Sequence, residues 1–328
     1  MTINSSRAVM VTGCAGFIGA TLCRRLLQNG VEVIGIDSIE GGYDPRIKHW
    51  RLEQLGGSNA FEYHNLSIND QNGLAALVKG RNVDAIVNLA ALAGVRASIE
   101  NPHEYYRVNV LGTLSLLETC KSFGIPNFVL ASTSSIYGNA AQPFVEDGAL
   151  GAMLSPYAAS KKAAEDLSRT YHELFGFDVA ILRYFTVYGP AGRPDMSIFR
   201  FIHWIASDEP VQVFGDGHQT RDFTFVDDVA DGTAKAIDLT GFNTINLGND
   251  NPASLVDVLT ILEQRLGRKA LVKTLPANDA DVRATRANIA RAADRLDWAP
   301  KISLEEGLGK TVDWYLENRE LASVMVTG

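Results

Sequence analysis

The stretch VTGCAGFIG (residues 11–19) is a β-branched run that ends in three spaced glycines. An apolar helical pattern follows as far as Asn29-Gly30, and a second strand-like run over 31–36 ends in Asp37. Glycines let the chain turn tightly and let a pyrophosphate approach the backbone at the start of a helix. An acid about 20 residues further on can accept hydrogen bonds from ribose hydroxyls. This order predicts a dinucleotide-binding unit, and because Asp37 would repel a 2′-phosphate, NAD is expected rather than NADP.

Strand-like runs recur beyond this unit, with helical patterns between them. They cover residues 61–64, 85–89, 127–132, 179–183 and 244–248. Strands that alternate with helices predict a parallel sheet covered on both faces, so the expected fold class is α/β, with a Rossmann-type doubly wound sheet. Ligands bind beyond the carboxyl ends of such strands. Small or polar residues stand at those ends: Ala90-Ala91, Thr133-Ser134-Ser135 and Tyr184-Phe185-Thr186.

The composition changes after Gly189, where glycine- and proline-rich turns replace the alternation of strands and helices. We expect residues 1–189 to form the NAD-binding domain, with 226–249 folding back onto it. Residues 190–225 and 250–328 would then form a smaller C-terminal α/β lobe for the substrate.

Charge and cysteine content exclude several classes of protein. The 328 residues carry a formal net charge of −8, which leaves no basic excess for nucleic acid. Three scattered cysteines, without a zinc-spaced His/Cys cluster, predict neither a disulfide framework nor a metal site. Residues 1–7 lack the apolar segment of a signal peptide, and no apolar run is long enough to span a membrane. We therefore expect a cytoplasmic protein without metal, membrane or nucleic-acid partners.

A second constellation lies in SPYAASK (residues 155–161), where Tyr157 and Lys161 are one helical turn apart. Ser155 suits the cap of a helix and Pro156 its first turn. A cation beside a phenol favours the phenolate, so the pair could act as an acid–base couple. The spacing alone is common, and a half-buried tyrosine beside a solvated lysine is its ordinary explanation.

With these motifs assembled, the chain resembles the extended short-chain dehydrogenase/reductases of the NAD-dependent sugar-nucleotide epimerase/dehydratase family. The resemblance runs nearly end to end and rests on TGCAGFIG (12–19), NLAA (88–91), STSSIYG (132–138), Tyr157 with Lys161, and RDFT (221–224). Within the family the chain is most similar to the UDP-glucuronate 4-epimerases, through AGVR (93–96), RYFTVYGP (183–190) and GRPDM (192–196).

The resemblance implies contacts for both ligands. Those to NAD are Gly13, Gly16, Phe17, Ile18, Gly19, Asp37, Ser38, Leu66, Leu89, Ala90, Ala91, Asn109, Tyr157, Lys161, Tyr184 and Val187. Those to a UDP-sugar, held by the C-terminal lobe, are Arg96, Thr133, Ser134, Ser135, Thr186, Arg193 and Arg221. It also implies a homodimer, formed through the helices near 104–123 and 157–175.

The implied reaction is C4 epimerisation of UDP-glucuronate to UDP-galacturonate through a 4-keto sugar. Tyr157 would take the proton of the 4-hydroxyl while C4 gives its hydride to NAD. Lys161 would hold the phenolate and bind the nicotinamide ribose. Thr133 would bond the 4-oxygen, with Ser134, also expected to be catalytic, and Ser135 flanking it. The keto sugar would then turn over and receive the hydride on its other face.

Other branches of the family differ at single positions. A 4,6-dehydratase would need Asp-Glu where this chain has Ser134-Ser135, and decarboxylases usually carry Glu at Ser135. Glucose epimerases typically carry Asn at Thr186, whereas Thr186 with Arg193 resembles a pair that holds a carboxylate. A UDP-glucose or UDP-N-acetylglucosamine 4-epimerase and a UDP-glucuronate decarboxylase remain alternatives. A cofactor sensor without turnover would not need Tyr157, Lys161 and Thr133 together.

Two of the substrate-side arginines have a simpler structural explanation. Arg193 could be a surface charge of its loop, and Arg96 could pair with Glu100 on a helix. Residues 278–281 depart from the Pro-Gly-Asp pattern expected beside a uridine, so the nucleotide base follows from the sequence less firmly than the sugar chemistry does.

Overall fold

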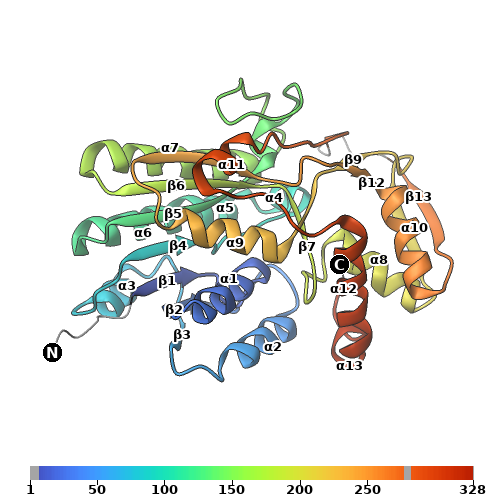
Figure 1. The fold of residues 1–328 in the computed structure, drawn as a ribbon, viewed down its shortest axis with the longest axis horizontal. Coiled ribbons are helices and arrows are strands. Elements are labelled where there is room, and N and C mark those ends of the chain that lie inside the picture. The colour runs from blue at the N-terminus through green and yellow to red at the C-terminus, as the bar shows by residue number, and fades with distance from the viewer. Residues whose placement is uncertain (1–6, 277–281, 328) are drawn as a thin grey trace.

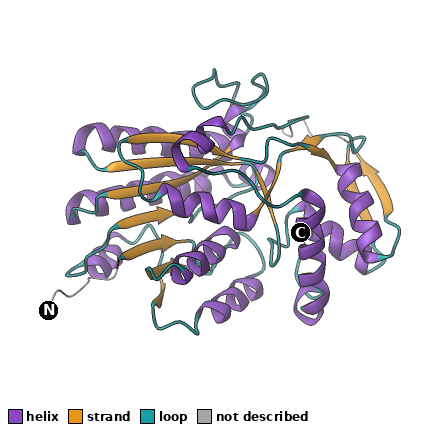
Figure 2. Ribbon diagram, viewed as in Figure 1, coloured by secondary structure: helices purple, strands orange, loops and turns teal. Residues whose placement is uncertain are grey.

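The computed structural model describes residues 7–276 and 282–327. A parallel sheet lies between two layers of helices, and a smaller group of helices and short strands lies beyond one end of it (Figures 1 and 2). This arrangement confirms the α/β class expected from the alternation of strands and helices.

The elements have the following bounds. The strands are β1 Ala8–Thr12, β2 Glu32–Asp37, β3 Phe61–Asn65, β4 Ala85–Asn88, β5 Asn127–Thr133, β6 Asp178–Tyr184, β7 Thr186–Tyr188, β8 Pro210–Phe214, β9 Thr220–Arg221, β10 Phe223–Phe225, β11 Phe242–Leu247, β12 Ala253–Ser254 and β13 Leu271–Leu275. The helices are α1 Phe17–Gln28, α2 Pro45–Leu55, α3 Gln71–Val78, α4 Val95–Glu100, α5 Pro102–Tyr106, α6 Gly112–Phe123, α7 Pro156–Phe175, α8 Ser197–Ala206, α9 Val226–Ala236, α10 Leu255–Leu266, α11 Ala290–Leu296, α12 Leu304–Glu317 and α13 Arg319–Ala322. A π-helical turn, η1 Arg107–Leu111, joins α5 to α6, and a 3₁₀ turn, η2 Ser134–Tyr137, follows β5.

The central sheet has seven parallel strands in the order β11-β6-β5-β4-β1-β2-β3. Every residue of β1 is buried, because the sheet is covered on both faces. Val9 and Val11 pack toward α1 and α9, while Met10 packs on the other face toward α3, α6 and α7. The strand order reverses between β1 and β4, and ligands of such sheets bind beyond the carboxyl ends of the strands at this point.

A second apolar core holds the smaller lobe together. Its buried side chains come mainly from α8, α10 and α12, around the two-stranded sheet β8-β13. Helix α2 also contributes Ile47 to this core, so it contacts both parts of the molecule. Residues 226–249 return to the large sheet, where α9 packs beside α1 and β11 pairs with β6.

Within residues 7–276 and 282–327, none of the helices is both long enough and apolar enough to cross a membrane. In the same residues, no group of His, Cys, Asp and Glu side chains is arranged to hold a metal ion.

Candidate active site

The turn between β1 and α1 leaves no room for side chains at its glycines. Gly13 has φ of +70°, and a Cβ there would lie 2.8 Å from the backbone of Leu89 and of Ala90. A Cβ on Gly19 would lie 2.0 Å from the Gly13 carbonyl oxygen. The turn therefore requires glycine and presses against the residues that follow β4. A tight turn with backbone N–H groups at the start of a helix fits the pyrophosphate of a dinucleotide.

Asp37 lies at the carboxyl end of β2 and is buried beside this turn. Its carboxylate accepts hydrogen bonds from the N–H of Ala15 at 3.2 Å and of Ile39 at 2.8 Å. Lys48 Nζ lies 3.7 Å from the same carboxylate. The acid expected to bind ribose is therefore held in place from the turn, from its own loop and from α2, and Ser38 follows it directly.

Helix α7 carries the tyrosine–lysine pair. Pro156 is its first residue, and the side chain of Ser155 accepts a hydrogen bond from Ala158 N–H at 3.2 Å. Lys161 is 3% exposed and donates to the Ala131 carbonyl at 2.8 Å. Burial lowers the pKa of Lys161 to about 8, although the charge of Glu165 opposes the shift.

Tyr157 is half-buried and faces the ends of two strands. Burial raises the pKa of its phenol, while a hydrogen bond with Thr133 and the charge of Arg193 lower it. The Thr133 hydroxyl accepts from Ser135 N–H and donates to Ser135 Oγ, both at 3.1 Å. The structure thus brings Tyr157, Thr133 and Arg193 together from three segments, and Ser134 opens the 3₁₀ turn beside them.

The loop after β7 positions Arg193. Its guanidinium donates to the Asp195 carboxylate at 3.0 and 2.6 Å and lies 5.0 Å from the centre of the Tyr43 ring. A third bond, of 3.4 Å, goes to the Ala93 carbonyl. Arg193 is thus mostly buried at the site and is not a surface charge. Thr186 begins β7, and its N–H donates to the Asp222 carbonyl at 3.0 Å.

Comparison with known proteins gives the family. The model of the NAD dependent epimerase/dehydratase family matches residues 9–248. The chain belongs to this family. It is 50% identical to the UDP-glucuronate 4-epimerase of Thermodesulfobacterium geofontis, over 95% of this chain and 97% of that one.

Solved structures agree with this assignment. The UDP-glucuronic acid 4-epimerase of Bacillus cereus, solved with UDP-glucuronic acid and NAD, is 36% identical and superposes with a TM-score of 0.90. The alignment covers 94% of this chain and 99% of that one. A UDP-glucose 4-epimerase of Thermotoga maritima, at 28% identity, superposes almost as well, with a TM-score of 0.88 over 95% of this chain and 99% of its own. The fold therefore confirms the NAD-dependent epimerase family, but single side chains must distinguish the sugars.

Of the two other expected substrate arginines, Arg96 contacts the smaller lobe and Arg221 lies in it. Arg96, on α4, stacks on the Phe214 ring at the end of β8, with 3.8 Å between the guanidinium carbon and the ring centre. This contact crosses to the other lobe. Arg221, in β9, donates to the Thr220 carbonyl at 2.9 Å.

Several expected cofactor contacts are already bonded within the protein. Asn109, in the π-helical turn, bonds both backbone groups of Leu92 and donates to Ser160 Oγ on α7. The Tyr184 hydroxyl shares a hydrogen bond with Thr233 on α9, and the side chain is part of the core. These two side chains therefore support neighbouring segments. Five other residues expected to contact NAD are partly buried against the cores on the two faces of the sheet: Ile18, Leu66, Leu89, Ala90 and Val187.

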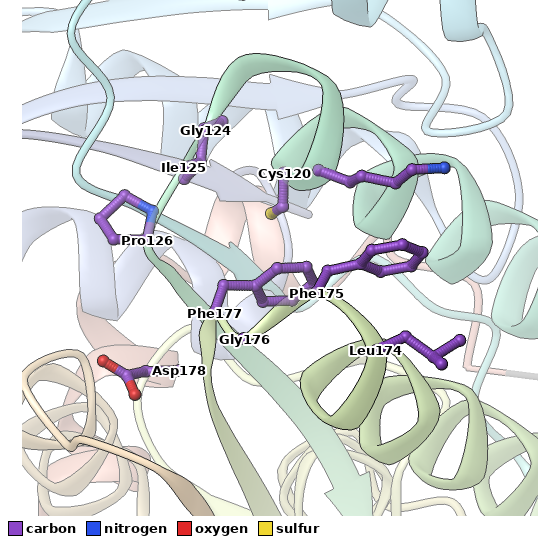
Figure 3. Close-up of a pocket in the computed structure, with 10 residues that line it drawn as sticks. Cys120, Gly124, Ile125, Pro126, Leu174, Phe175, Gly176, Phe177 and Asp178 are labelled. Carbon is purple, nitrogen blue, oxygen red and sulfur yellow. The ribbon is translucent and has the colours of Figure 1, made fainter.

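Two features fall outside this site. A hollow of about 560 Å³ lies where α6 and α7 end and β5 and β6 begin (Figure 3). Tyr157 lies at the other end of α7. The sequence predictions on residues 1–6 and 278–281 lie outside the residues that the structure describes.

A buried ion pair behind Lys161 was not predicted from the sequence. Arg183 on β6 donates to both Glu165 carboxylate oxygens, at 3.0 and 2.9 Å, and Ser132 Oγ donates to the same carboxylate at 2.5 Å. Arg183 also donates to the Tyr137 hydroxyl at 2.9 Å. Glu165 stands one turn beyond Lys161, as Lys161 stands one turn beyond Tyr157, so helical spacing could have identified it.

We expect Glu165→Gln to move the alkaline limb of the pH profile to lower pH. Loss of the Glu165 charge removes an interaction that raises the pKa of Lys161, so Lys161 gives up its proton earlier as the pH rises. Because kcat/KM reports the ionisations of the free enzyme, its decline above pH about 8 should begin sooner. The control is Glu173→Gln at the exposed end of α7. An unchanged alkaline limb in folded Glu165→Gln would exclude this influence on Lys161.

Proposed function

We propose that the protein converts UDP-glucuronate to UDP-galacturonate by NAD-dependent epimerisation at C4. The observation that carries the proposal is the position of Arg193. This side chain extends from the loop after β7 and is mostly buried beside Tyr157 and Thr133. An arginine can bind the planar carboxylate of a uronate through two parallel hydrogen bonds. The 50% identity to a UDP-glucuronate 4-epimerase supports the same substrate.

The glycine turn and Asp37 would hold the cofactor, and Lys161 would lie on its nicotinamide side. Bound NAD supplies the carbon that accepts the C4 hydride and later returns it. Tyr157 accepts the proton of the 4-hydroxyl as the hydride leaves, and it gives the proton back when the ketone is reduced. Lys161, protonated below pH about 8, favours the phenolate. The Thr133 hydroxyl, bonded to Tyr157, keeps the 4-oxygen in line with that phenol.

The substrate carboxylate needs particular control. Oxidation at C4 makes glucuronate a β-keto acid, which loses carbon dioxide when the bond to the carboxylate aligns with the carbonyl π-system. Arg193 would hold the carboxylate out of that alignment, with Thr186 beside it. Because Asp195 bonds the same guanidinium, the substrate must share Arg193 with Asp195 or displace it.

Product analysis tests this function. Pure protein is incubated with UDP-glucuronate and NAD, and the products are separated by chromatography with mass detection. A new UDP-sugar of unchanged mass is expected. A product lighter by carbon dioxide would identify a decarboxylase, and turnover of UDP-glucose in its place would identify a neutral-sugar epimerase.

The two lobes would bind different ligands in this reaction. Residues 1–189, with 226–249 returning to the sheet, would bind NAD, and residues 190–225 with 250–328 would bind the UDP moiety. A cytoplasmic location is proposed because Cys14, Cys23 and Cys120 are all free thiols, as a reducing compartment would keep them.

We also expect a homodimer through α6, α7 and the turn before them. These segments and the last residue of α5 expose five large apolar side chains: Tyr106, Leu111, Phe123, Leu174 and Phe175. Large apolar groups exposed to solvent favour association with a second copy. Light scattering at micromolar concentration should give twice the chain mass, and Leu111→Lys should lower it. A monomeric wild type would contradict the dimer.

A further inference from the structure

Arg51, on α2, is a buried arginine between the glycine turn and the loop that carries Arg193. It is 3% exposed, and no carboxylate forms an ion pair with it among residues 7–276 and 282–327. A buried cation without a carboxylate is unfavourable unless all its donors are bonded. A buried arginine at this position therefore indicates a role that an apolar side chain could not fill.

All five N–H donors of Arg51 are bonded. Nη1 donates to the Ala15 carbonyl at 3.0 Å and to the Tyr43 hydroxyl at 2.6 Å. Nε and Nη2 donate to the Ala191 carbonyl at 3.1 and 2.6 Å, and Nη2 also donates to the Gly192 carbonyl at 3.2 Å. Since the guanidinium is planar and its donors are fixed in direction, these bonds set the separation of the three segments.

Each segment that Arg51 bonds leads directly to a residue of the site. Ala15 belongs to the glycine turn, and its N–H donates to the Asp37 carboxylate. Gly192 immediately precedes Arg193. Tyr43 presents its ring to the Arg193 guanidinium while its hydroxyl accepts from Arg51. One side chain therefore connects the ribose-binding side of the site to the substrate arginine.

The loop needs such support because its backbone is strained. Ala191 has φ of +51°, a left-handed conformation that is unfavourable for a residue with a side chain. Its carbonyl accepts two of the five Arg51 bonds. Without them, the local sequence would favour another path for the chain into Arg193.

We propose that Arg51 is a positioning residue that holds the Arg193 loop against the glycine turn between β1 and α1. By doing so it keeps the substrate carboxylate from leaving as carbon dioxide. This inference rests on the proposed epimerisation of UDP-glucuronate. In the side reaction the C5–C6 bond of the 4-keto sugar breaks, and its electron pair forms the C4 enolate. Carbon dioxide departs, and C5 takes a proton from water. A loosened Arg193 would let the carboxylate rotate into the alignment that this step needs.

The test compares product ratios in four full-length proteins supplied with NAD and UDP-glucuronate. Arg51→Lys keeps the charge but loses the planar set of five donors. Tyr43→Phe removes one hydrogen-bond acceptor and keeps the aromatic ring beside Arg193. We expect Arg51→Lys to raise the ratio of decarboxylated to epimerised product at least tenfold and to raise KM more than it lowers kcat. Tyr43→Phe should change the ratio in the same direction by less. Arg46→Lys, on the same helix but bonded to Asp44 and the Val324 carbonyl, should match the wild type.

Each outcome decides the matter. A wild-type protein that forms no epimer would overturn the proposed function, and this inference with it. Suppose that the wild type epimerises and that folded Arg51→Lys and Tyr43→Phe give the wild-type ratio of decarboxylated to epimerised product. The role proposed for Arg51 would then be wrong, and the proposed epimerase function would be unaffected. A merely structural role would lower the melting temperature without changing the ratio. If Arg51→Lys does not fold, an unchanged ratio in Tyr43→Phe alone overturns the proposal.

Discussion

Tyr157→Phe is expected to lower kcat by about 10³-fold, within the range that a positioned acid–base group contributes. The variant keeps the aromatic ring but loses the oxygen that bonds Thr133 and would accept the substrate proton. Neither the glycine turn nor Asp37 contacts this hydroxyl, so NAD should remain bound. Initial rates on UDP-glucuronate measure the first effect, and the nucleotide released on denaturation measures the second.

Tyr171→Phe is the matched control, because it removes a hydroxyl from the same helix. That hydroxyl, near the end of α7, bonds Glu118, whereas Tyr157 lies in the first turn of the helix. The control should retain wild-type kcat. Undiminished activity in Tyr157→Phe would show that another group moves the proton.

Arg193→Ala is expected to lower kcat/KM for UDP-glucuronate by about 10²-fold. A charged hydrogen-bonded pair contributes roughly 1.5–3 kcal/mol, and the removal of one partner leaves the other unsatisfied. The 4-keto sugar should also lose carbon dioxide more often, because nothing holds its carboxylate in place. UDP-glucose, which has no carboxylate, should lose little of any turnover that the wild type shows.

Arg24→Ala provides the comparison, since Arg24 is exposed on α1 and pairs with Asp227. Both variants change the net charge equally, so a difference between them reports the local contact and not long-range attraction. Equal losses on UDP-glucuronate and UDP-glucose in Arg193→Ala would exclude the carboxylate role.

Short-range patterns predicted the parts of this molecule that depend on neighbouring residues. The glycines of 11–19 and the acid at Asp37 lie in one βαβ unit, whose geometry leaves few alternatives. The cap at Ser155 and the turn between Tyr157 and Lys161 follow from helix geometry alone. The alternation of strands and helices likewise gave the parallel sheet.

Contacts between distant segments could not be predicted in this way. Arg51 bonds residues 140 positions away, and nothing near it in the sequence indicates that its charge is buried. The resemblance implies a cofactor contact for Tyr184, and the bond of its hydroxyl to Thr233 on α9 is a second long-range contact that no local pattern indicates.

The most direct test of the account is to follow a deuterium atom placed on C4 of UDP-glucuronate. If the hydride leaves C4 and returns to the same carbon within one protein molecule, the UDP-galacturonate formed in ordinary water should keep the label at C4. The mass of the product and of its fragments measures this retention. Replacement of the label by solvent hydrogen, at a rate equal to epimerisation, would contradict transfer through the bound cofactor and would require a different mechanism.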